Sequence, residues 1–242
     1  MKPGSVVIIG AGVMGASVAY HLAARGWRDV VILDRSERPG QGSTGAATGG
    51  FRAQYATAIN VRLSLLARQK LHTFKEETGT DPGYLPAGYL WLATTPSELT
   101  ELRAGLEVQR AAGLHEAVEV SPDDAGRLNP AVRYDRVVGG VFCPTDGFIA
   151  PLQILRGYLD AAARHGVRAE WKTQVRGFRL GTGRITSVET DRGWIDADVV
   201  IIAAGAWACG VAGWADVPLP VAPLRRQVAG KVPCNRLPGN LP

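Results

Sequence analysis

The sequence predicts an α/β fold in which a parallel-sheet domain is interleaved with an incomplete α+β domain. An apolar strand over residues 5–9 runs into a glycine-rich turn, and a helix over 12–25 leads to a second apolar strand over 29–34. A third apolar run, 199–203, ends in another turn of small residues. Two strands joined by a crossover helix form a parallel pair, and this pair is the basis of the predicted sheet.

The first turn has the spacing of a dinucleotide-binding motif, Gly10-x-Gly12-x-x-Gly15. Gly10 permits the tight turn out of the strand, Gly12 lets a pyrophosphate approach the backbone, and Gly15 lets the helix lie close to the sheet. Val13 and Met14 open this helix, whose N-terminal N–H groups face the ligand. The strand before the turn and the helix after it favour a ligand site over a glycine-rich turn without a ligand.

Asp34 closes the second strand, where a carboxylate can accept hydrogen bonds from a ribose diol. Small residues fill the following stretch, 39–50, whose composition alone could describe a flexible linker. A helical segment follows, with Ile59, Leu63 and Leu66 on one face. A loop docked against the nucleotide is the better interpretation, because its backbone N–H groups can hold phosphate. These features together predict a Rossmann-like nucleotide-binding domain.

From Thr78 the pattern changes to short elements, which indicates α+β material inserted into the nucleotide-binding domain. An amphipathic helix then begins at Pro151 and ends at His165-Gly166. The expected strands of these two regions cover residues 89–93, 117–120, 137–142, 167–171, 174–180, 184–190, 199–203 and 223–232, and further helices are expected over 96–112 and after Ser121. We assign residues 1–80 and 146–216 to the nucleotide-binding domain, and 81–145 and 217–242 to a partial substrate domain.

The strand over 199–203 is expected to be buried and ends in the turn Ala204-Gly205-Ala206-Trp207. This turn lies at the carboxyl end of the strand, where open α/β sheets bind ligands. We expect Trp207 to pack against this end of the sheet.

The composition excludes several classes of protein for this chain. The 242 residues are 46% hydrophobic and 20% charged, which is ordinary for a globular protein, and the net charge is +5. The arginines are scattered, which argues against a nucleic-acid surface. No metal-binding pattern, membrane span or signal peptide is expected, and three widely spaced cysteines fit a reducing compartment, so a cytoplasmic location is expected.

Several motifs follow one another along the chain: Gly10/Gly12/Gly15 with Asp34, the loop from Gly42-Ser43-Thr44-Gly45 to Gly49-Gly50-Phe51-Arg52, Asp146-Gly147 before Pro151, residues 198–207 and residues 220–227. In this order the motifs are specific, and the chain resembles FAD enzymes of the D-amino acid oxidase/sarcosine oxidase type. The nearest group is the sarcosine oxidase β-subunit and dimethylglycine dehydrogenase. The resemblance implies a two-domain fold, FAD as the cofactor, and oxidation of the C–N bond of a small amine or amino acid by hydride transfer to flavin N5.

The resemblance also implies roles for individual residues. The glycine turn would hold the FAD pyrophosphate, Asp34 the adenosine ribose, and Arg35 would lie beside that ribose. Ser43 and Thr44 would donate to the phosphates, and Val175 would contact adenine through its backbone. The remaining residues expected at the cofactor are Gly42, Gly49, Gly50, Ala204, Gly205 and Trp207.

Arg52 is the one candidate for substrate binding, because a guanidinium fork matches a carboxylate bidentately. A surface salt bridge, or a contact with the flavin phosphates, is the alternative for this residue. No histidine stands in a pattern typical of a catalytic base.

Three other interpretations remain open: a D-amino acid or opine dehydrogenase, an inactive FAD-binding fragment or subunit, and an NAD(P)-dependent enzyme. The second glycine loop and the turn at residues 203–207 favour FAD over NAD(P). Members of the resembled family are longer, so the chain is expected to lack a C-terminal half or to need a partner subunit, and missing strands would leave apolar sheet surface exposed.

Overall fold

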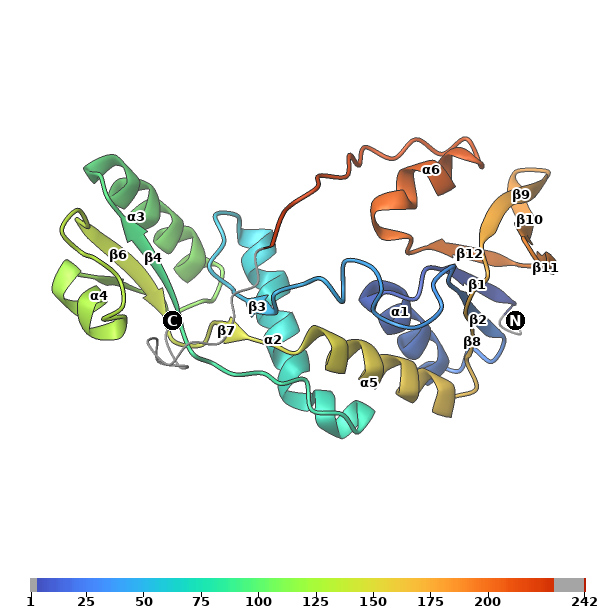
Figure 1. Cartoon of the computed structure of the whole chain (residues 1–242), viewed down its shortest axis with the longest axis horizontal. Helices are drawn as coiled ribbons and strands as arrows, with labels where there is room; N and C mark the ends of the chain where they lie inside the picture. The colour runs from blue at the N-terminus through green and yellow to red at the C-terminus, as the bar shows by residue number, and fades with distance from the viewer. Residues whose placement is uncertain (1–3, 229–241) are drawn as a thin grey trace. The chain divides into compact units, whose positions relative to one another are not determined.

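The computed structural model describes residues 4–228 and 242, which form two compact units (Figure 1). Of these residues, the first unit contains 4–48, 75–82 and 151–228, and the second contains 49–74, 83–150 and 242. The division differs from the expected domains in four stretches, of which residues 81–82 belong to the first unit and residues 146–150 to the second. Residues 49–74 belong to the second unit, because Gly50 and Phe51 pair there with residues 147–148, and residues 217–228 belong to the first unit.

A four-stranded parallel sheet forms the centre of the first unit, in the order β12-β1-β2-β8. These strands are β1 (Val6–Ile9), β2 (Val30–Leu33), β8 (Arg168–Glu170) and β12 (Val199–Ile202). Val6 of β1 pairs with Val30 on one side and with Val199 on the other. Helix α1 (Val13–Ala24) is the predicted crossover from β1 to β2. The α/β fold with a parallel sheet is therefore confirmed.

Alternate side chains of the central strands enter two different cores. Val6 and Ile8 point to the face covered by α1 and by α5 (Pro151–Arg164). Val7 and Ile9 point to the opposite face, which packs against the antiparallel sheet of β9 (Val175–Gly181), β10 (Arg184–Thr190) and β11 (Gly193–Asp196). Both faces of β1 are covered, which explains why its sequence is a continuous apolar run rather than an alternating one.

The C-terminal part of the first unit departs from two expectations. β12 is less buried than expected, with Val199 39% exposed, because it is the edge strand of the described sheet. After it come a short 3₁₀ turn (Gly205–Trp207) and α6 (Ala208–Gly213). The strand expected over 223–232 is wrong for residues 223–228, which form no strand, and its other residues lie outside the described part.

The second unit contains a three-stranded antiparallel sheet, in the order β4-β6-β5, with two helices against it. The elements are β4 (Tyr89–Ala93), α3 (Pro96–Ala111), β5 (Val118–Val120), α4 (Pro122–Leu128) and β6 (Gly139–Cys143), and a two-stranded ribbon joins β3 (Gly50–Phe51) to β7 (Gly147–Phe148). Thr95 and Glu98 form a reciprocal capping box at the start of α3. This box satisfies backbone N–H groups that the first turn of a helix leaves unpaired.

The buried side of helix α2 (Ala58–Thr78) is not the apolar face that the sequence indicates. Ile59, Leu63 and Leu66 do share a face, but they are 62%, 56% and 54% exposed. The buried side is formed by Val61 and Leu65, which pack in the core of the second unit. The helix therefore has two apolar sides, and the pattern alone could not distinguish the packed one. Within the described residues, none of the helices is long and apolar enough to cross a membrane.

Candidate functional site

The glycine turn after β1 is shaped by close backbone approach. Gly10 has φ +108°, and a Cβ there would overlap the carbonyl oxygen of Ala203 at the end of β12. A Cβ on Gly15 would overlap the carbonyl oxygen of Gly10, because α1 starts directly above the turn. Both glycines are therefore explained by contacts within the protein.

Gly12 differs from these two glycines. Thr44 Oγ1, at 3.4 Å, is the nearest atom that a Cβ on Gly12 would meet, so no backbone excludes a side chain there. Gly12 is the N-cap of α1 and has no side chain with which to cap the helix, and the first turn contains no acidic residue. The unpaired N–H groups of a helix N-terminus attract an anion. The residues present therefore fit a phosphate at this position.

The loop of small residues lies against the same helix end. The backbone N–H of Val13 donates to Thr44 Oγ1 at 3.1 Å, across 31 residues of sequence. Within the loop, Gly45 N–H donates to the carbonyl oxygen of Gly42 at 3.1 Å, and a Cβ on Gly45 would overlap the carbonyl oxygen of Gly40. Met14 and Ser43 are exposed beside these contacts. The loop is thus a built part of the site rather than a linker.

Asp34 is held in position by two backbone donors. Its Oδ2 accepts from Ala11 N–H at 2.7 Å, and its Oδ1 accepts from Ser36 N–H at 2.8 Å. A carboxylate has about four lone-pair sites, so each oxygen can also accept from a ribose hydroxyl. The carbonyl oxygen of Asp34 accepts from Thr173 N–H at 2.9 Å, which brings the start of β9 to the same sheet end. Val175 has a buried side chain, so only its backbone can face a ligand.

The turn after β12 contributes the third edge of this site. Ala203 N–H donates to the carbonyl oxygen of Ile9 at 2.8 Å, which aligns the two strand ends. Ala204 is half-buried and Gly205 is exposed. Trp207 is 54% exposed and does not pack on the sheet end as expected. Its ring instead lies under the guanidinium of Arg35, whose central carbon is 3.9 Å from the ring centroid.

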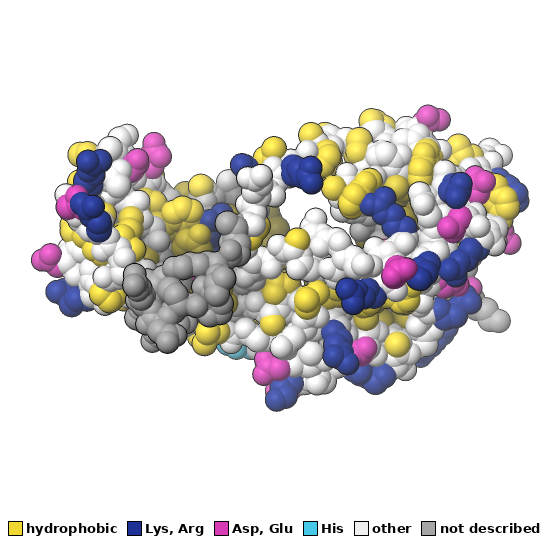
Figure 2. Space-filling view, in the orientation of Figure 1, with side chains coloured by type: hydrophobic (Ala, Val, Ile, Leu, Met, Phe, Trp, Pro, Cys, Tyr) yellow, Lys and Arg dark blue, Asp and Glu magenta, His cyan; other side chains and the backbone are white. Residues whose placement is uncertain are grey.

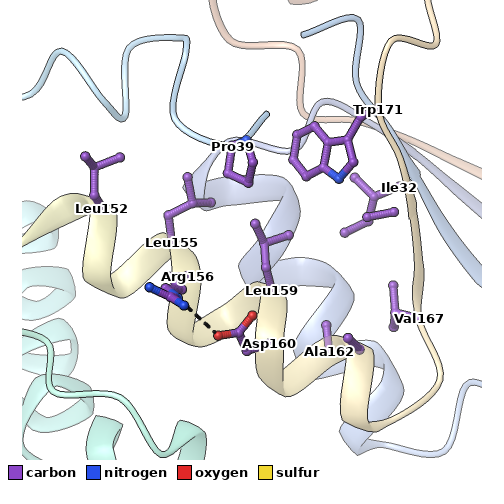
Figure 3. Close-up of a pocket in the computed structure, with 12 residues that line it drawn as sticks. Ile32, Pro39, Leu152, Leu155, Arg156, Leu159, Asp160, Ala162, Val167 and Trp171 are labelled. Carbon is purple, nitrogen blue, oxygen red and sulfur yellow. Dashed lines mark ion pairs between the residues drawn. The ribbon is translucent and has the colours of Figure 1, made fainter. Parts of the chain in front are cut away.

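An apolar hollow of about 430 Å³ lies elsewhere in the first unit (Figure 3). Leu152, Leu155 and Leu159 of α5 line it together with Pro39 and Trp171. The charged residues that line it, Arg156 and Asp160, form an ion pair with each other at 3.5 Å. The packing here holds the glycine loop, since a Cβ on Gly40 would meet Leu152 Cδ2. The hollow belongs to the helix-covered side of the sheet, whereas the nucleotide turn is at the carboxyl ends of the strands.

Three of the expected site residues belong to the second unit. The carbonyl oxygen of Gly49 accepts from Ile149 N–H at 2.7 Å, and Gly50 pairs with Phe148. Arg52 follows this ribbon and lies among three aromatic rings. Its guanidinium carbon is 4.8, 5.1 and 5.9 Å from the ring centroids of Tyr55, Trp91 and Tyr89.

The guanidinium of Arg52 is only half-buried, and among the described residues it makes no ion pair. An arginine held by aromatic faces keeps its hydrogen-bond donors free. The arrangement can therefore bind a carboxylate of a small molecule.

Asp146 positions the backbone next to Arg52, a role that sequence reasoning missed. Its fully buried carboxylate accepts from Ala53 N–H at 2.8 Å, Gln54 N–H at 3.4 Å and Gln54 Nε2 at 3.3 Å. Burial raises the pKa of Asp146, and these hydrogen bonds partly oppose the rise. In the sequence, Asp146 stands out only as an acidic residue in an otherwise uncharged stretch before Gly147. Its hydrogen-bond partners lie more than ninety residues away along the chain, so no local pattern indicates them.

A family model and several known proteins match this chain. Residues 5–237 match the model of the family described as "DAO: FAD dependent oxidoreductase". The chain is 31% identical to the mitochondrial dimethylglycine dehydrogenase of Rattus norvegicus over 222 residues, which are 91% of this chain and 26% of the relative. It is also 31% identical to the mitochondrial pyruvate dehydrogenase phosphatase regulatory subunit of Mus musculus, over 84% of this chain and 23% of that protein.

Solved structures agree with the fold. The glycine oxidase of Geobacillus kaustophilus matches with a TM-score of 0.80 and 28% identity, over 92% of this chain and 61% of that one. The L-proline dehydrogenase of P. horikoshii matches with a TM-score of 0.81 and 26% identity, over 89% and 56%. The chain thus spans about a quarter of the mitochondrial relatives and rather more than half of these two structures.

Proposed function

Because the chain belongs to the DAO family of FAD-dependent oxidoreductases, we propose that it binds FAD and takes part in oxidising the C–N bond of a small amine or amino acid. The substrate class is that of sarcosine and dimethylglycine, since the chain is homologous to the dehydrogenases of these two compounds. The chain covers only part of each relative, so this activity is proposed for the protein that contains the described residues.

One observation carries the cofactor proposal. The Gly10–Gly15 turn, the loop at Thr44 and the carboxylate of Asp34 are joined by hydrogen bonds around one helix N-terminus. An NAD(P) site would need the turn and the acid but not the loop. In the proposed complex, the N-terminus of α1 and the Ser43–Thr44 segment hold the pyrophosphate, and Asp34 holds the adenosine ribose.

The residues of the second unit would act on the substrate. Bound FAD would supply the acceptor for a hydride from the carbon next to the amine. Arg52 would bind the substrate carboxylate through its free donors, which limits the orientations of the reacting C–H bond. Asp146 would keep Arg52 in place through the backbone of residues 53–54. The protein thus contributes orientation and charge, and the described residues suggest no separate base.

A second candidate is a non-catalytic FAD-binding subunit. The similarity to a protein named as a regulatory subunit supports it. A D-amino acid or opine dehydrogenase is a third candidate of the same chemistry. These candidates differ in whether substrate reduces the flavin and in which substrate does so.

A visible absorption spectrum separates the candidates. The purified chain should bind FAD, and sarcosine or dimethylglycine should bleach the flavin absorption under anaerobic conditions. Bound flavin that no N-methyl or D-amino acid reduces would favour the non-catalytic subunit. Binding of NAD without binding of FAD would contradict the proposal altogether.

A further inference from the structure

The apolar hollow on the helix-covered side of the sheet is a cavity that the proposed function does not use (Figure 3). The most deeply buried residues that line it are Ile32 of β2 and Leu155 and Ala162 of α5, each only 1% exposed. Its volume of about 430 Å³ falls within the range of about 300–1,000 Å³ that is usual for small-molecule sites. The hollow is therefore large enough to hold a small molecule.

The hollow is open to solvent on the side of strand β8. Ala169 of β8 pairs with Ile32, so the two side chains share the face of the sheet that lines the hollow. β8 is an edge strand of the described sheet, and Ala169 is exposed. Leu152, on the α5 side, is exposed as well. A ligand can thus reach the buried lining without displacing a helix or a strand.

An ion pair of α5 stands beside this apolar lining. Arg156 and Asp160 lie on successive turns of the helix, with Nε 3.5 Å from Oδ2, and their side chains are 81% and 55% exposed (Figure 3). The base precedes the acid, which is the less favourable order for a pair four residues apart, and exposed pairs contribute little to stability. Within residues 4–228 neither side chain makes a second ion pair. The pair can therefore open at little cost and offer both charges to a ligand.

The combination of lining and charges selects one class of ligand. An amino acid with an apolar side chain carries a carboxylate, an ammonium group and an apolar group on one carbon. A guanidinium binds a carboxylate bidentately, and a carboxylate accepts from an ammonium group. The apolar group would be buried among Leu155, Leu159 and Trp171, which removes it from water. An anion alone would be repelled by Asp160, and a purely apolar molecule would gain nothing from either charge.

We propose that the hollow binds a free amino acid with a branched or aromatic side chain. Its carboxylate binds Arg156, its ammonium group binds Asp160, and its side chain occupies the hollow. The site is distinct from the proposed substrate site at Arg52, which belongs to the second unit. The inference depends neither on FAD nor on amine oxidation.

L-leucine is the probe, and calorimetry on the full chain measures its binding. The dissociation constant should lie below about 1 mM, which is ordinary for a ligand of this size. Three analogues each lack one of the three groups: 4-methylpentanoate has no ammonium, isopentylamine has no carboxylate, and glycine has no side chain. Each analogue should bind at least roughly tenfold more weakly. Equal affinities for L-leucine and 4-methylpentanoate would overturn the proposal.

Substitutions of the ion pair test its role in recognition. Arg156→Gln and Asp160→Asn should each weaken L-leucine binding by roughly tenfold, because each removes one charge-assisted partner. Arg133→Gln is the matched control, since Arg133 is also an exposed arginine paired with an aspartate, and it should change the affinity by less than about twofold. Wild-type affinity in both Arg156→Gln and Asp160→Asn would contradict the proposal.

Ala169→Phe tests the cavity itself. An aromatic ring suits an exposed strand position, so the melting temperature should stay close to wild type while the ring fills the hollow and removes L-leucine binding. Arg52→Ala should leave L-leucine binding intact. The reverse result, with binding lost in Arg52→Ala and kept in Ala169→Phe, would place the amino acid at the proposed substrate site and refute this inference. A chain that binds FAD but no L-leucine would refute the inference alone, and one that binds L-leucine but no FAD would refute only the proposed function.

Discussion

At the scale of single residues, the three glycines of the turn after β1 are explained by different contacts. Gly15 and Gly10 leave no room for a side chain because backbone oxygens lie against them. Gly12 has room, since no atom lies closer than 3.4 Å to the position that a Cβ would take. A glycine that the protein does not need for its own packing indicates close approach of a ligand. We therefore expect Gly10 and Gly15 to be required for the fold and Gly12 to be required for ligand binding.

Gly12→Ala should separate these two roles. We expect the melting temperature to stay close to wild type while FAD affinity falls by tenfold or more, roughly the loss of one charge-assisted hydrogen bond. Gly15→Ala should lower the melting temperature itself, because α1 must shift. Gly210→Ala, where a Cβ meets nothing within 4 Å, is the control and should leave FAD binding unchanged. Equal loss of stability in Gly12→Ala and Gly15→Ala would contradict this distinction.

Substitution of Arg52 should weaken substrate binding and leave FAD binding unchanged. Arg52→Lys keeps the charge but loses the planar fork, so anaerobic flavin reduction at low substrate concentration should slow by roughly tenfold, and Arg52→Ala should slow it further. The FAD content should not change. Arg133→Ala, an exposed arginine of the same unit, is the matched control. Unchanged reduction kinetics in Arg52→Ala would remove this residue from the substrate site.

Asp146 should give the protein a defined pH dependence. Because burial raises the pKa of Asp146, the folded protein keeps a proton at pH values where the unfolded chain has lost it. For this group the free energy of unfolding is greatest below the unfolded pKa of about 3.9 and decreases as pH rises through the higher folded pKa.

Asp146→Asn tests this dependence by urea denaturation over a series of pH values. The stability of wild type relative to this variant should decrease as the pH rises through that window. Asp123→Asn removes an exposed carboxylate and serves as the control for a change of net charge. A difference that grows with pH would show that the hydrogen bonds outweigh burial. Asp146→Ala should cost about 3 kcal/mol at the low-pH end of this window, because buried donors lose their acceptor, and this cost should also decrease as the pH rises.

At the scale of elements, short local signals and long-range packing can be compared directly. The Thr95–Glu98 capping box needs only residues within one turn, and α3 begins there as its sequence predicts. Helix α2 shows the opposite case. Its two apolar sides look alike in sequence, and only the position of the second unit's core selects the side with Val61. Strand β12 likewise has the composition of a buried strand but lies at an edge.

Thr95→Ala should therefore have a local and predictable cost. Loss of this cap should destabilise the protein by about 1 kcal/mol, measured by denaturant unfolding. Thr100→Ala within the same helix removes an exposed threonine that does not cap the N-terminus, and should cost much less. Equal costs for the two variants would mean that the capping box does not stabilise α3.

At the scale of the whole molecule, apolar surface remains uncovered in the described residues. The exposed row on α2 (Ile59, Leu63 and Leu66) and the edge of β12 are examples, and hydrophobic side chains are visible on the surface in Figure 2. Exposed apolar rows and free strand edges favour association.

The isolated chain should therefore associate as its concentration increases. Sedimentation velocity should detect this association, and replacing both Leu63 and Leu66 by lysine should reduce it. Leu180→Lys, at an isolated leucine that is 51% exposed, is the control and should not reduce it. A wild-type chain that stays monomeric at high concentration would contradict the prediction.

The sequence by itself determined the parallel α/β core, the glycine-rich turn after its first strand and the family. Each of these depends on local spacing: two apolar strands, three glycines at fixed intervals, and an acid at a strand end. Tertiary structure alone decided that Asp146 holds the backbone beside Arg52, that Arg35 lies over Trp207, and which side of α2 is packed. Those contacts join residues that are distant in sequence, and their energies depend on burial and on distance in space, which no local pattern encodes.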